Sequence, residues 1–520
     1  MGAGQAEIEL KLHVAAADLA RLRDHAAVTS LQIGPAKRQR QVTTYFDTPD
    51  HRLAEKGFAL RVRRVGRSFR QSVKARARTP LGKDGAASVR DEWEWPIEGD
   101  RPNLAALAQT GLADLLNRGP RALAPIFTTD VERTRIDLEA GRGSRIELAL
   151  DHGTVRAGSA VQPISEVELE LRPDGGDGRT GRLYDLALAL HRTVPLQIGT
   201  LSKADLGYAM LTGRAPGAHR ARAVPLDPRA SAADTFGSIA RSCLGHLLDN
   251  QACLLAAPDN PAAVEAVHQM RVALRRLRTA LGIFATLIDR ASVAPLKQEL
   301  RWLAGELSPA RDWDVFVDET LARCRGEAAK PARRVARTAA AARDAARERA
   351  AAALRAPRYT ALILTLGGMI EDERWRPAGA AGAAAAAPIA GLAPRLLDRC
   401  AKKLGRAGKH VARHTIEERH ALRKALKRLR YGASFLGELY PAKRAAPYLD
   451  ALGDLQDKLG TLNDLAVARG LFTALGSSGD AALAADIAAL DALFVQRLEK
   501  RAATLPTVWR KLKDAAPFWR

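Results

Sequence analysis

Short runs of alternating hydrophobic and charged residues fill most of the first 212 positions, and Gly, Pro or Asp separates one run from the next. The first run, EIELKL at 7–12, would place two carboxylates and an ammonium on one face of a strand, because successive strand side chains point to opposite faces. The same alternation returns in LRVRR at 60–64, RQSVK at 70–74, RDEWEW at 90–95, VERTRIDL at 131–138, RIELALD at 145–151 and EVELEL at 166–171. This half is predicted to be rich in antiparallel strands.

The second half has a different texture, with long Ala-, Leu- and Arg-rich stretches at helical spacing. A Gly-, Pro- and Arg-rich stretch at 213–230 separates the halves and is predicted to be a linker. An Ala/Arg helix is expected at about 331–355, and the low-complexity segment at 376–388 is expected to be a mobile loop. The predicted fold class is therefore α+β multidomain, with a β-rich domain followed by an all-α domain.

The helical half contains an internal repeat. HQMRVALRRLR at 268–278 returns as HALRKALKRLR at 420–430, which is 152 residues later (268 against 420). At the same offset, LAGELSPARDWDVF at 303–316 aligns with LQDKLGTLNDLAVA at 455–468, and Asp312 aligns with Asp464. A repeat of this size indicates a duplicated helical unit.

The net charge of +23 is unevenly distributed. Residues 1–214 hold 32 Lys and Arg against 27 Asp and Glu, which leaves 49 against 31 for residues 215–520. Such a surplus attracts polyanions, and charge alone does not choose among nucleic acid, an anionic membrane and polyphosphate. The four cysteines are widely spaced, and neither a signal sequence nor a spanning apolar stretch is apparent, so we expect a soluble cytoplasmic protein without membrane partners.

The charged faces of the first half admit two interpretations. An antiparallel sheet often has one solvated face, and each strand taken alone fits that description. Taken together, strands with paired carboxylates alternate with strands with paired cations, which favours a closed sheet whose lumen holds a ligand. Carboxylates at i and i+2 can chelate a hard divalent cation, whereas Arg and Lys can hold phosphate oxygens. A polyphosphate compound would use both sets.

The ordered set of motifs resembles the CYTH domain of the triphosphate tunnel metalloenzymes. The set comprises the ExExK pattern at 7–11, YFDTPD at 45–50, LRVR at 60–63, VK at 73–74, RDEWEW, ELALD at 147–151, EVELEL and LSKADLGY at 201–208. The resemblance covers residues 5–212 and implies an eight-stranded antiparallel tunnel that binds a triphosphate and Mg²⁺ or Mn²⁺.

The resemblance also implies roles for individual residues. The expected metal ligands are Glu7, Glu9, Glu166 and Glu168. The residues expected to clamp phosphate are Lys11, Arg61, Arg63, Lys74, Arg133 and Lys203. Catalytic support is expected from Glu7, Glu9, Lys11, Glu92, Glu147 and Asp151. Tyr45 and Asp47 are expected to shape a turn, and His13 and His152 are expected at the surface.

The repeated basic helices resemble the CHAD domain, a histidine-containing helical module. The resemblance covers about residues 228–515, with repeats at about 228–375 and 390–515 after a linker at 213–227, and implies binding of inorganic polyphosphate. Residues at i, i+3, i+7 and i+10 share one helix face, and both copies begin this face with His. The implied polyphosphate-binding residues are His268, Arg271, Arg275, Arg276, Arg278, His420, Arg423, Lys427, Arg428 and Arg430.

The order CYTH then CHAD resembles the bacterial inorganic triphosphatases. The resemblance implies metal-dependent hydrolysis of triphosphate to pyrophosphate and phosphate, with polyphosphate as a second partner and polyphosphate granules as a further location. Two alternatives stay open: a non-catalytic granule-binding protein, and a tunnel enzyme acting on thiamine triphosphate or ATP. Nucleic acid is not an expected partner, because the basic helices lack interleaved aromatic residues.

Overall fold

The computed structural model describes residues 5–75, 88–110, 112, 123–141, 143–172, 179–256, 258, 260–476 and 480–520. The chain divides into two compact units. The first unit comprises residues 1–217 with 251–256 and 354–374, and the second comprises 218–250, 257–353 and 375–520. The first unit therefore takes in two segments from the helical half of the sequence. Within the described residues, no helix is both long and apolar enough to cross a membrane.

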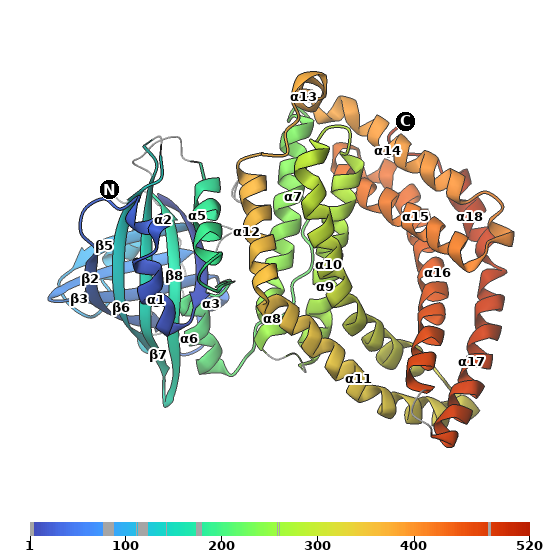
Figure 1. The fold of residues 1–520 in the computed structure, drawn as a ribbon, viewed down its shortest axis with the longest axis horizontal. Coiled ribbons are helices and arrows are strands. Elements are labelled where there is room, and N and C mark those ends of the chain that lie inside the picture. Colours follow the sequence, from blue (N-terminus) through green and yellow to red (C-terminus); the bar gives the residue numbers. More distant parts are fainter. Residues whose placement is uncertain are drawn as a thin grey trace. The chain divides into compact units, whose positions relative to one another are not determined.

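The first unit is built on an antiparallel sheet of nine strands that closes on itself (Figure 1). The strands are β1 (Gln5–Val14), β2 (Lys37–Asp47), β3 (Phe58–Val65), β4 (Ser68–Ala75), β5 (Ser88–Ile97), β6 (Ala124–Glu139), β7 (Arg145–Ala157), β8 (Ala160–Leu171) and β9 (Leu196–Ile198). Their order is β5-β4-β3-β2-β6-β7-β8-β1-β9, and pairing of β5 with β1 joins the first eight into a ring. The predicted eight-stranded antiparallel tunnel is confirmed.

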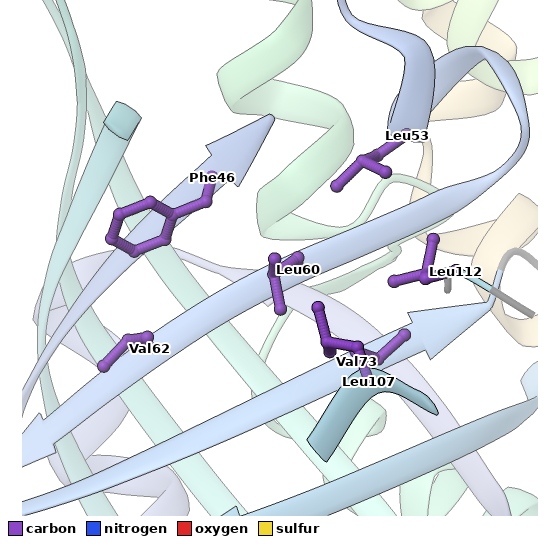
Figure 2. Close-up of a cluster of buried hydrophobic side chains, with 7 residues drawn as sticks. All are labelled: Phe46, Leu53, Leu60, Val62, Val73, Leu107 and Leu112. Atoms are coloured by element: carbon purple, nitrogen blue, oxygen red, sulfur yellow. The ribbon is translucent and has the colours of Figure 1, made fainter. Parts of the chain in front are cut away.

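The apolar faces of these strands point out of the ring, as the cluster drawn in Figure 2 demonstrates. Leu60, Val62 and Val73 of β3 and β4 pack with Leu53 from α3 (Arg52–Glu55) and Leu107 from the short helix η2 (Ala105–Gln109), which lie outside the sheet. Because side chains alternate along a strand, the charged residues between these positions point into the lumen.

One end of the lumen is closed by apolar side chains and by helix α6 (Lys203–Thr212). Tyr45 and Phe127 follow the same strand faces as the charged residues, yet both rings are buried, and their centroids are 4.5 Å apart. Tyr208 of α6 packs edge-on against Phe127 at 5.2 Å. Gly207 permits this approach, since a Cβ there would lie 2.2 Å from the Phe127 ring.

Further helices cover the outside of the first unit: α1 (Leu19–Arg23), α2 (Ala26–Thr29), α3, α5 (Gly181–His191), α8 (Gln251–Ala256) and α12 (Pro357–Glu371). Helix α5 packs on β8, and α12 packs on α5. Gln251 joins these layers, because its amide donates to the Ile198 carbonyl at 2.8 Å and accepts from the Tyr359 hydroxyl at 2.8 Å.

The second unit is a pair of repeated helical bundles (Figure 1). The first bundle contains α7 (Ala232–Asp249), α9 (Pro261–Ile283), α10 (Arg290–Asp314) and α11 (Ala329–Arg355), and the second contains α14 (Ile389–Ala407), α15 (Ile416–Leu436), α16 (Ala442–Leu475) and α17 (Ala481–Ala502). Helices α10 and α11 begin 152 residues before α16 and α17, as the sequence repeat predicted. The repeated basic helices α9 and α15 pack on each other.

Two local predictions have different outcomes. The Ala/Arg helix expected at 331–355 is confirmed by α11. The loop expected at 376–388 is wrong, because Gly379–Ala386 forms helix α13, which agrees with the high helix propensity of Ala. Residues 213–230, where the linker was expected, contain neither helix nor strand.

The packing of α12 on α5, which assigns α12 to the first unit, can be tested by substitution. A Cβ at Gly367 would lie 2.2 Å from Cε1 of Tyr184, whose side chain is only 1% exposed and cannot move aside. Gly367→Ala should therefore destabilise the sheet unit by about 1–3 kcal/mol, measured by urea unfolding. Gly305→Ala in α10 is the matched control, since nothing lies near its Cβ position, and it should be neutral or stabilising. Equal stability of the two variants would contradict the packing.

Candidate functional site

The centre of the lumen holds three carboxylates that the ring closure brings together, two of them buried and one half-buried. Asp151 of β7 lies opposite Glu166 of β8 in the strand register, and Glu168 follows two residues later on the same face. One oxygen from each of the three lies within 4.8 Å of the others. Asp151 and Glu166 are at most 1% exposed, so this acidic cluster is withdrawn from solvent.

Two ammonium groups compensate the acidic cluster. Lys11 of β1 donates to Glu168 at 2.9 Å and to Glu166 at 3.2 Å. Lys203, the first residue of α6, pairs with Asp151 at 2.7 Å, with Glu168 at 2.9 Å and with Glu166. Burial lowers the pKa of each lysine, but the surrounding carboxylates outweigh burial and raise it, so both stay charged.

An arginine completes the charge balance. Arg133 of β6 holds Asp151 in a bidentate pair, with Nε 2.7 Å and Nη2 2.6 Å from its two oxygens, and it also contacts Glu168. Burial alone would raise the pKa of Glu168, but Lys11, Lys203 and Arg133 together hold it well below its ordinary value. The pKa of Asp151 is lowered as well, so Asp151 and Glu168 stay ionised at neutral pH.

A second ionic group lies on the strands across the lumen. Glu92 of β5 is 3.2 Å from Arg61 Nη2 and 3.1 Å from Lys74 Nζ, and Arg61 Nε also donates to the Ser72 hydroxyl at 3.0 Å. Arg63 is different, because its buried Nε has no hydrogen-bond partner among the described residues. Arg61 beside it, then burial, lower the pKa of Arg63 to about 10. An anion in the lumen would stabilise this cation.

A third group contains residues that the sequence analysis did not single out. Glu147 of β7 pairs with Arg135 Nε at 2.9 Å and with Arg172, which also donates to Glu170 at 3.1 Å. Arg172 lies two residues beyond Glu170, so continuing the alternation of β8 by one step would have found it.

The expected site residues of the tunnel whose side chains the structure describes thus converge on one lumen. Glu9 lies 3.8 Å from Lys11 and extends the acidic side along β1. Glu7 pairs with Arg90 in the β1–β5 register, but its side chain lies outside the described residues.

Two further expectations concern residues outside the charged groups. Asp47 shapes a turn as expected, since its carboxylate accepts from the backbone amides of Thr48, Leu53 and Ala54, and the Tyr208 hydroxyl donates to it at 2.7 Å. His152 is exposed as predicted. The surface prediction for His13 is wrong: the ring is half-buried beside Glu166, and burial lowers its pKa.

The chemistry of the donor set fits a hard divalent cation beside a phosphate chain. Carboxylate oxygens are the ligands that Mg²⁺ and Mn²⁺ prefer, and Asp151, Glu166 and Glu168 present them within a few ångströms of one another. Their present partners are the ends of long side chains, which can turn toward a phosphate when a cation takes their place. The lumen can therefore hold cation and anion side by side.

In the helical unit, α9 and α15 bring the two predicted basic faces together. Arg271 donates to Asp312 at 3.1 Å and to the Ser308 carbonyl at 3.0 Å, and Arg275 of α9 donates to the Tyr431 hydroxyl of α15 at 2.7 Å. Burial lowers the pKa of Arg423, and Asp464, the repeat counterpart of Asp312, partly offsets that lowering.

Lys427 lies within this basic face and is electrostatically unusual. Burial, followed by repulsion from Arg275 and Arg423, lowers its pKa to about 6. Burial and the neighbouring Arg311 likewise lower the pKa of His268. Arg311 is a basic residue of this region that the sequence analysis did not assign. The face therefore holds closely spaced cations that a polyanion would stabilise.

Not every residue of the predicted basic set lies on this face. Arg278 and His420 are exposed, and Arg430 is half-buried. Arg276 is only 8% exposed and stacks over Phe435, while Arg428 donates to the Gly282 carbonyl. These two arginines point into the packing between α9 and α15, which corrects their assignment to a surface open to polyphosphate.

Comparison with known proteins agrees with these two architectures. The CYTH domain model matches residues 5–178, and the CHAD domain model matches residues 238–473. An inorganic triphosphatase of Haemophilus influenzae is 34% identical over 168 residues, which are 32% of this chain and 45% of that protein. The match thus spans less than half of the Haemophilus protein.

Two other similarities cover the helical region. An uncharacterised protein of Mycobacterium tuberculosis is 28% identical over 460 residues, covering 84% of this chain and 83% of its own length. The crystal structure of the CHAD domain from the plant Ricinus communis aligns with a TM-score of 0.51 at 30% identity, over 57% of this chain and 97% of that one. The chain therefore joins a CYTH domain, at residues 5–178, to a CHAD domain, at residues 238–473.

Proposed function

We propose that the tunnel hydrolyses inorganic triphosphate to pyrophosphate and phosphate with the help of Mg²⁺ or Mn²⁺, and that the CHAD domain binds inorganic polyphosphate. The observation that carries the tunnel proposal is the pairing, in one closed lumen, of a buried acidic cluster with cations on the facing strands. The similarity to a Haemophilus inorganic triphosphatase supports the choice of substrate.

The lysines that neutralise the acidic cluster would exchange partners when the tunnel is loaded. Lys11 and Lys203 would leave Glu166 and Glu168 and donate to phosphate oxygens, whose charge replaces that of the carboxylates. A cation bound by Asp151, Glu166 and Glu168, with Glu9 nearby, would supply Lewis acidity and lower the pKa of a bound water.

The cations on the facing strands would stabilise charge on the reacting phosphates. Catalysis of phosphoryl transfer depends mainly on positioning and electrostatic stabilisation, and preorganised charges act strongly in a dry site. Arg63 has a buried nitrogen without a partner among the described residues and would gain a phosphate oxygen directly. Arg61 and Lys74, held through Glu92, would fix the remaining oxygens.

The closed end of the lumen favours a short linear substrate. Tyr45, Phe127 and α6 block passage beyond the acidic cluster, so a chain can enter from the opposite end only. Triphosphate would fit inside such a dead-ended tunnel, whereas a long polyphosphate could insert only its terminus. This geometry favours triphosphate over internal cleavage of long chains.

The CHAD domain would bind long-chain polyphosphate. The cations of α9 and α15 are close enough to depress one another's pKa values, and a polyphosphate would relieve that repulsion along its length. Binding there would hold the protein on cytoplasmic polyphosphate granules and leave the tunnel free for triphosphate. A phosphate-release panel of triphosphate, ATP, thiamine triphosphate and long-chain polyphosphate, with and without metal, tests the proposal as a whole.

Glu168→Gln should abolish most triphosphate hydrolysis, because the amide keeps the shape of the carboxylate but loses the charge that holds a cation. We expect a loss on the order of 10²–10³ in rate, measured as phosphate release, and a chelator should reproduce it in the parent. The control is Glu132→Gln on the outer face of β6, where the carboxylate pairs with Arg38. Full activity of Glu168→Gln in a folded protein would refute the metal assignment.

Polyphosphate binding by the full chain should depend on six basic residues of the repeated helices α9 and α15. Binding in chelator should weaken steeply with salt, with a log–log slope of about −0.9 per contact in the DNA analogue. The six cations to be changed to Ala are Arg271, Arg275, Arg278, Arg423, Lys427 and Arg430. This variant should lose most binding and salt dependence while triphosphate hydrolysis survives.

The matched control for the six-residue variant removes the same charge from other exposed positions of the second unit. These positions are Lys330, Arg333, Arg337, Lys500, Arg501 and Arg510. Loss of affinity in both variants to the same degree would mean that polyphosphate recognises net charge alone, and unchanged affinity in the first would place the binding surface elsewhere.

Polyphosphate binding should also take up protons, because Lys427 is largely neutral in the free protein and a polyanion restores its charge. The free pKa of about 6 means that uptake should approach one proton at pH 8 and that affinity should fall as the pH rises above 6. Calorimetry in buffers of different ionisation enthalpy measures the uptake. Lys427→Met should remove it, and the exposed Lys424→Met should not. No uptake in the parent would contradict the low pKa.

A further inference from the structure

A basic cavity lies in the second bundle. Its lining residues belong neither to the tunnel nor to the α9–α15 face. It is formed by the C-terminal end of α14, the short helix η5 (Val411–Arg413), α16 and α18 (Leu505–Asp514), and its volume is about 860 Å³. That volume falls within the range of small-molecule sites, roughly 300–1,000 Å³. The basic residues that line it are Lys409, His410, Arg413, Lys513 and Arg520.

The charges of this cavity are poorly compensated. Its lining among the described residues contains no Asp or Glu side chain. Arg520 pairs with Asp398 at 2.9 Å, but Lys409, Arg413 and Lys513 are exposed and form no ion pair within the part of the chain that the structure describes. Lys511, two residues before Lys513, pairs with Asp454 at 2.5 Å instead. The cavity is therefore a concave site of one sign of charge, which favours a multiply charged anion.

The turn that carries three of these basic residues is strained. His410 has a φ of 56°, in the left-handed region that residues other than Gly adopt infrequently. Gly408 just before it packs under Trp509, since a Cβ there would lie 2.1 Å from Cζ2 of the indole. This turn brings Lys409, His410 and Arg413 to the same rim of the cavity, and Trp509 forms part of the cavity wall.

The duplicated fold does not account for these cations. At the offset of 152 residues, Lys409 and Arg413 correspond to Ala257 and Pro261, neither of which is charged. At the offset of 152 residues, Lys513 corresponds to Ala361 of α12. The basic rim thus exists in the second repeat alone, as expected of a feature with its own ligand.

The apolar part of the lining narrows the ligand class. Trp509 is half-buried in the wall, together with the side chains of Leu404, Val411 and Leu512. An inorganic phosphate chain would gain nothing from such a wall, whereas an aromatic base can stack on an indole. We propose that the cavity binds a nucleoside polyphosphate, with the base against Trp509 and the phosphates held by Lys409, Arg413 and Lys513.

Photoaffinity labelling locates the ligand without interference from the tunnel. The full chain, kept in chelator, is irradiated with 2-azido-ATP, and labelled peptides are identified by mass spectrometry. We expect label on peptides that contain Trp509 or residues 405–413, and unlabelled ATP should prevent it at lower concentration than inorganic triphosphate. Equal protection by triphosphate would overturn the nucleotide assignment, and label confined to tunnel peptides would overturn the site.

Charge variants provide the second arm of the test. The triple variant Lys409→Ala, Arg413→Ala, Lys513→Ala should raise the ATP concentration that half-protects these peptides by about tenfold or more, since three charge-assisted contacts are lost. The control Lys402→Ala, Arg406→Ala, Lys511→Ala removes the same charge from residues outside the cavity lining and should change it little. Equal effects of the two sets would show non-specific attraction only, which overturns the proposal.

A more conservative variant is less disruptive to the fold than the triple variant. Trp509→Phe keeps an aromatic ring above Gly408 but offers a smaller stacking surface, and it should weaken protection by ATP several-fold while leaving protection by triphosphate unchanged. Circular dichroism checks that the variants fold. If a folded Trp509→Phe protein is protected by ATP as well as the parent is, the base does not contact Trp509 and the proposal fails.

Discussion

The buried charge balance inside the ring is the constraint on which the sheet unit depends. Asp151 and Glu166 would each be too costly to bury alone, because an uncompensated carboxylate in the interior loses several kcal/mol of hydration. Lys11 and Lys203 approach them from two different elements, so the cluster forms only when the ring has closed and α6 has docked. Replacing one partner therefore affects the fold and the site together.

The same balance explains why a charged lumen and a stable ring are compatible. The apolar faces of the strands pack outward against helices, as in the cluster around Leu60 and Leu107, and supply the hydrophobic stabilisation that a barrel usually has inside. The lumen is then free to hold charges. Helix α6 contributes to both the charged and the apolar part of the lumen. Its Lys203 contacts the acidic cluster, and its Tyr208 packs on Phe127 at the closed end of the lumen and donates a hydrogen bond to Asp47.

In the helical unit, duplication produced one shared face and one divergent one. The counterparts Arg271 and Arg423 each lie beside an aspartate of their own repeat, and the packing of α9 on α15 brings both onto one basic face. On another side the repeats differ: α8 and α12 of the first repeat joined the sheet unit, whereas η5 and α18 of the second kept a basic cavity. Two copies of one bundle therefore present different surfaces.

The sequence by itself determined the strands, their two faces and the helical duplication, because periods of two and of 3.6 residues and a repeat of 152 residues are local or directly countable properties. Only the tertiary structure decided which charges meet. The docking of α6 placed Lys203 against Glu166, and the pairing of β1 with β8 half-buried His13, which no pattern in its neighbours indicated. Arg276 and Arg428 share the basic composition of their helices, yet packing turned them inward. Helix α12 lies in the helical half of the sequence, but its contacts with residues far away in the chain assign it to the sheet unit. Such long-range contacts produce no periodic pattern in the sequence.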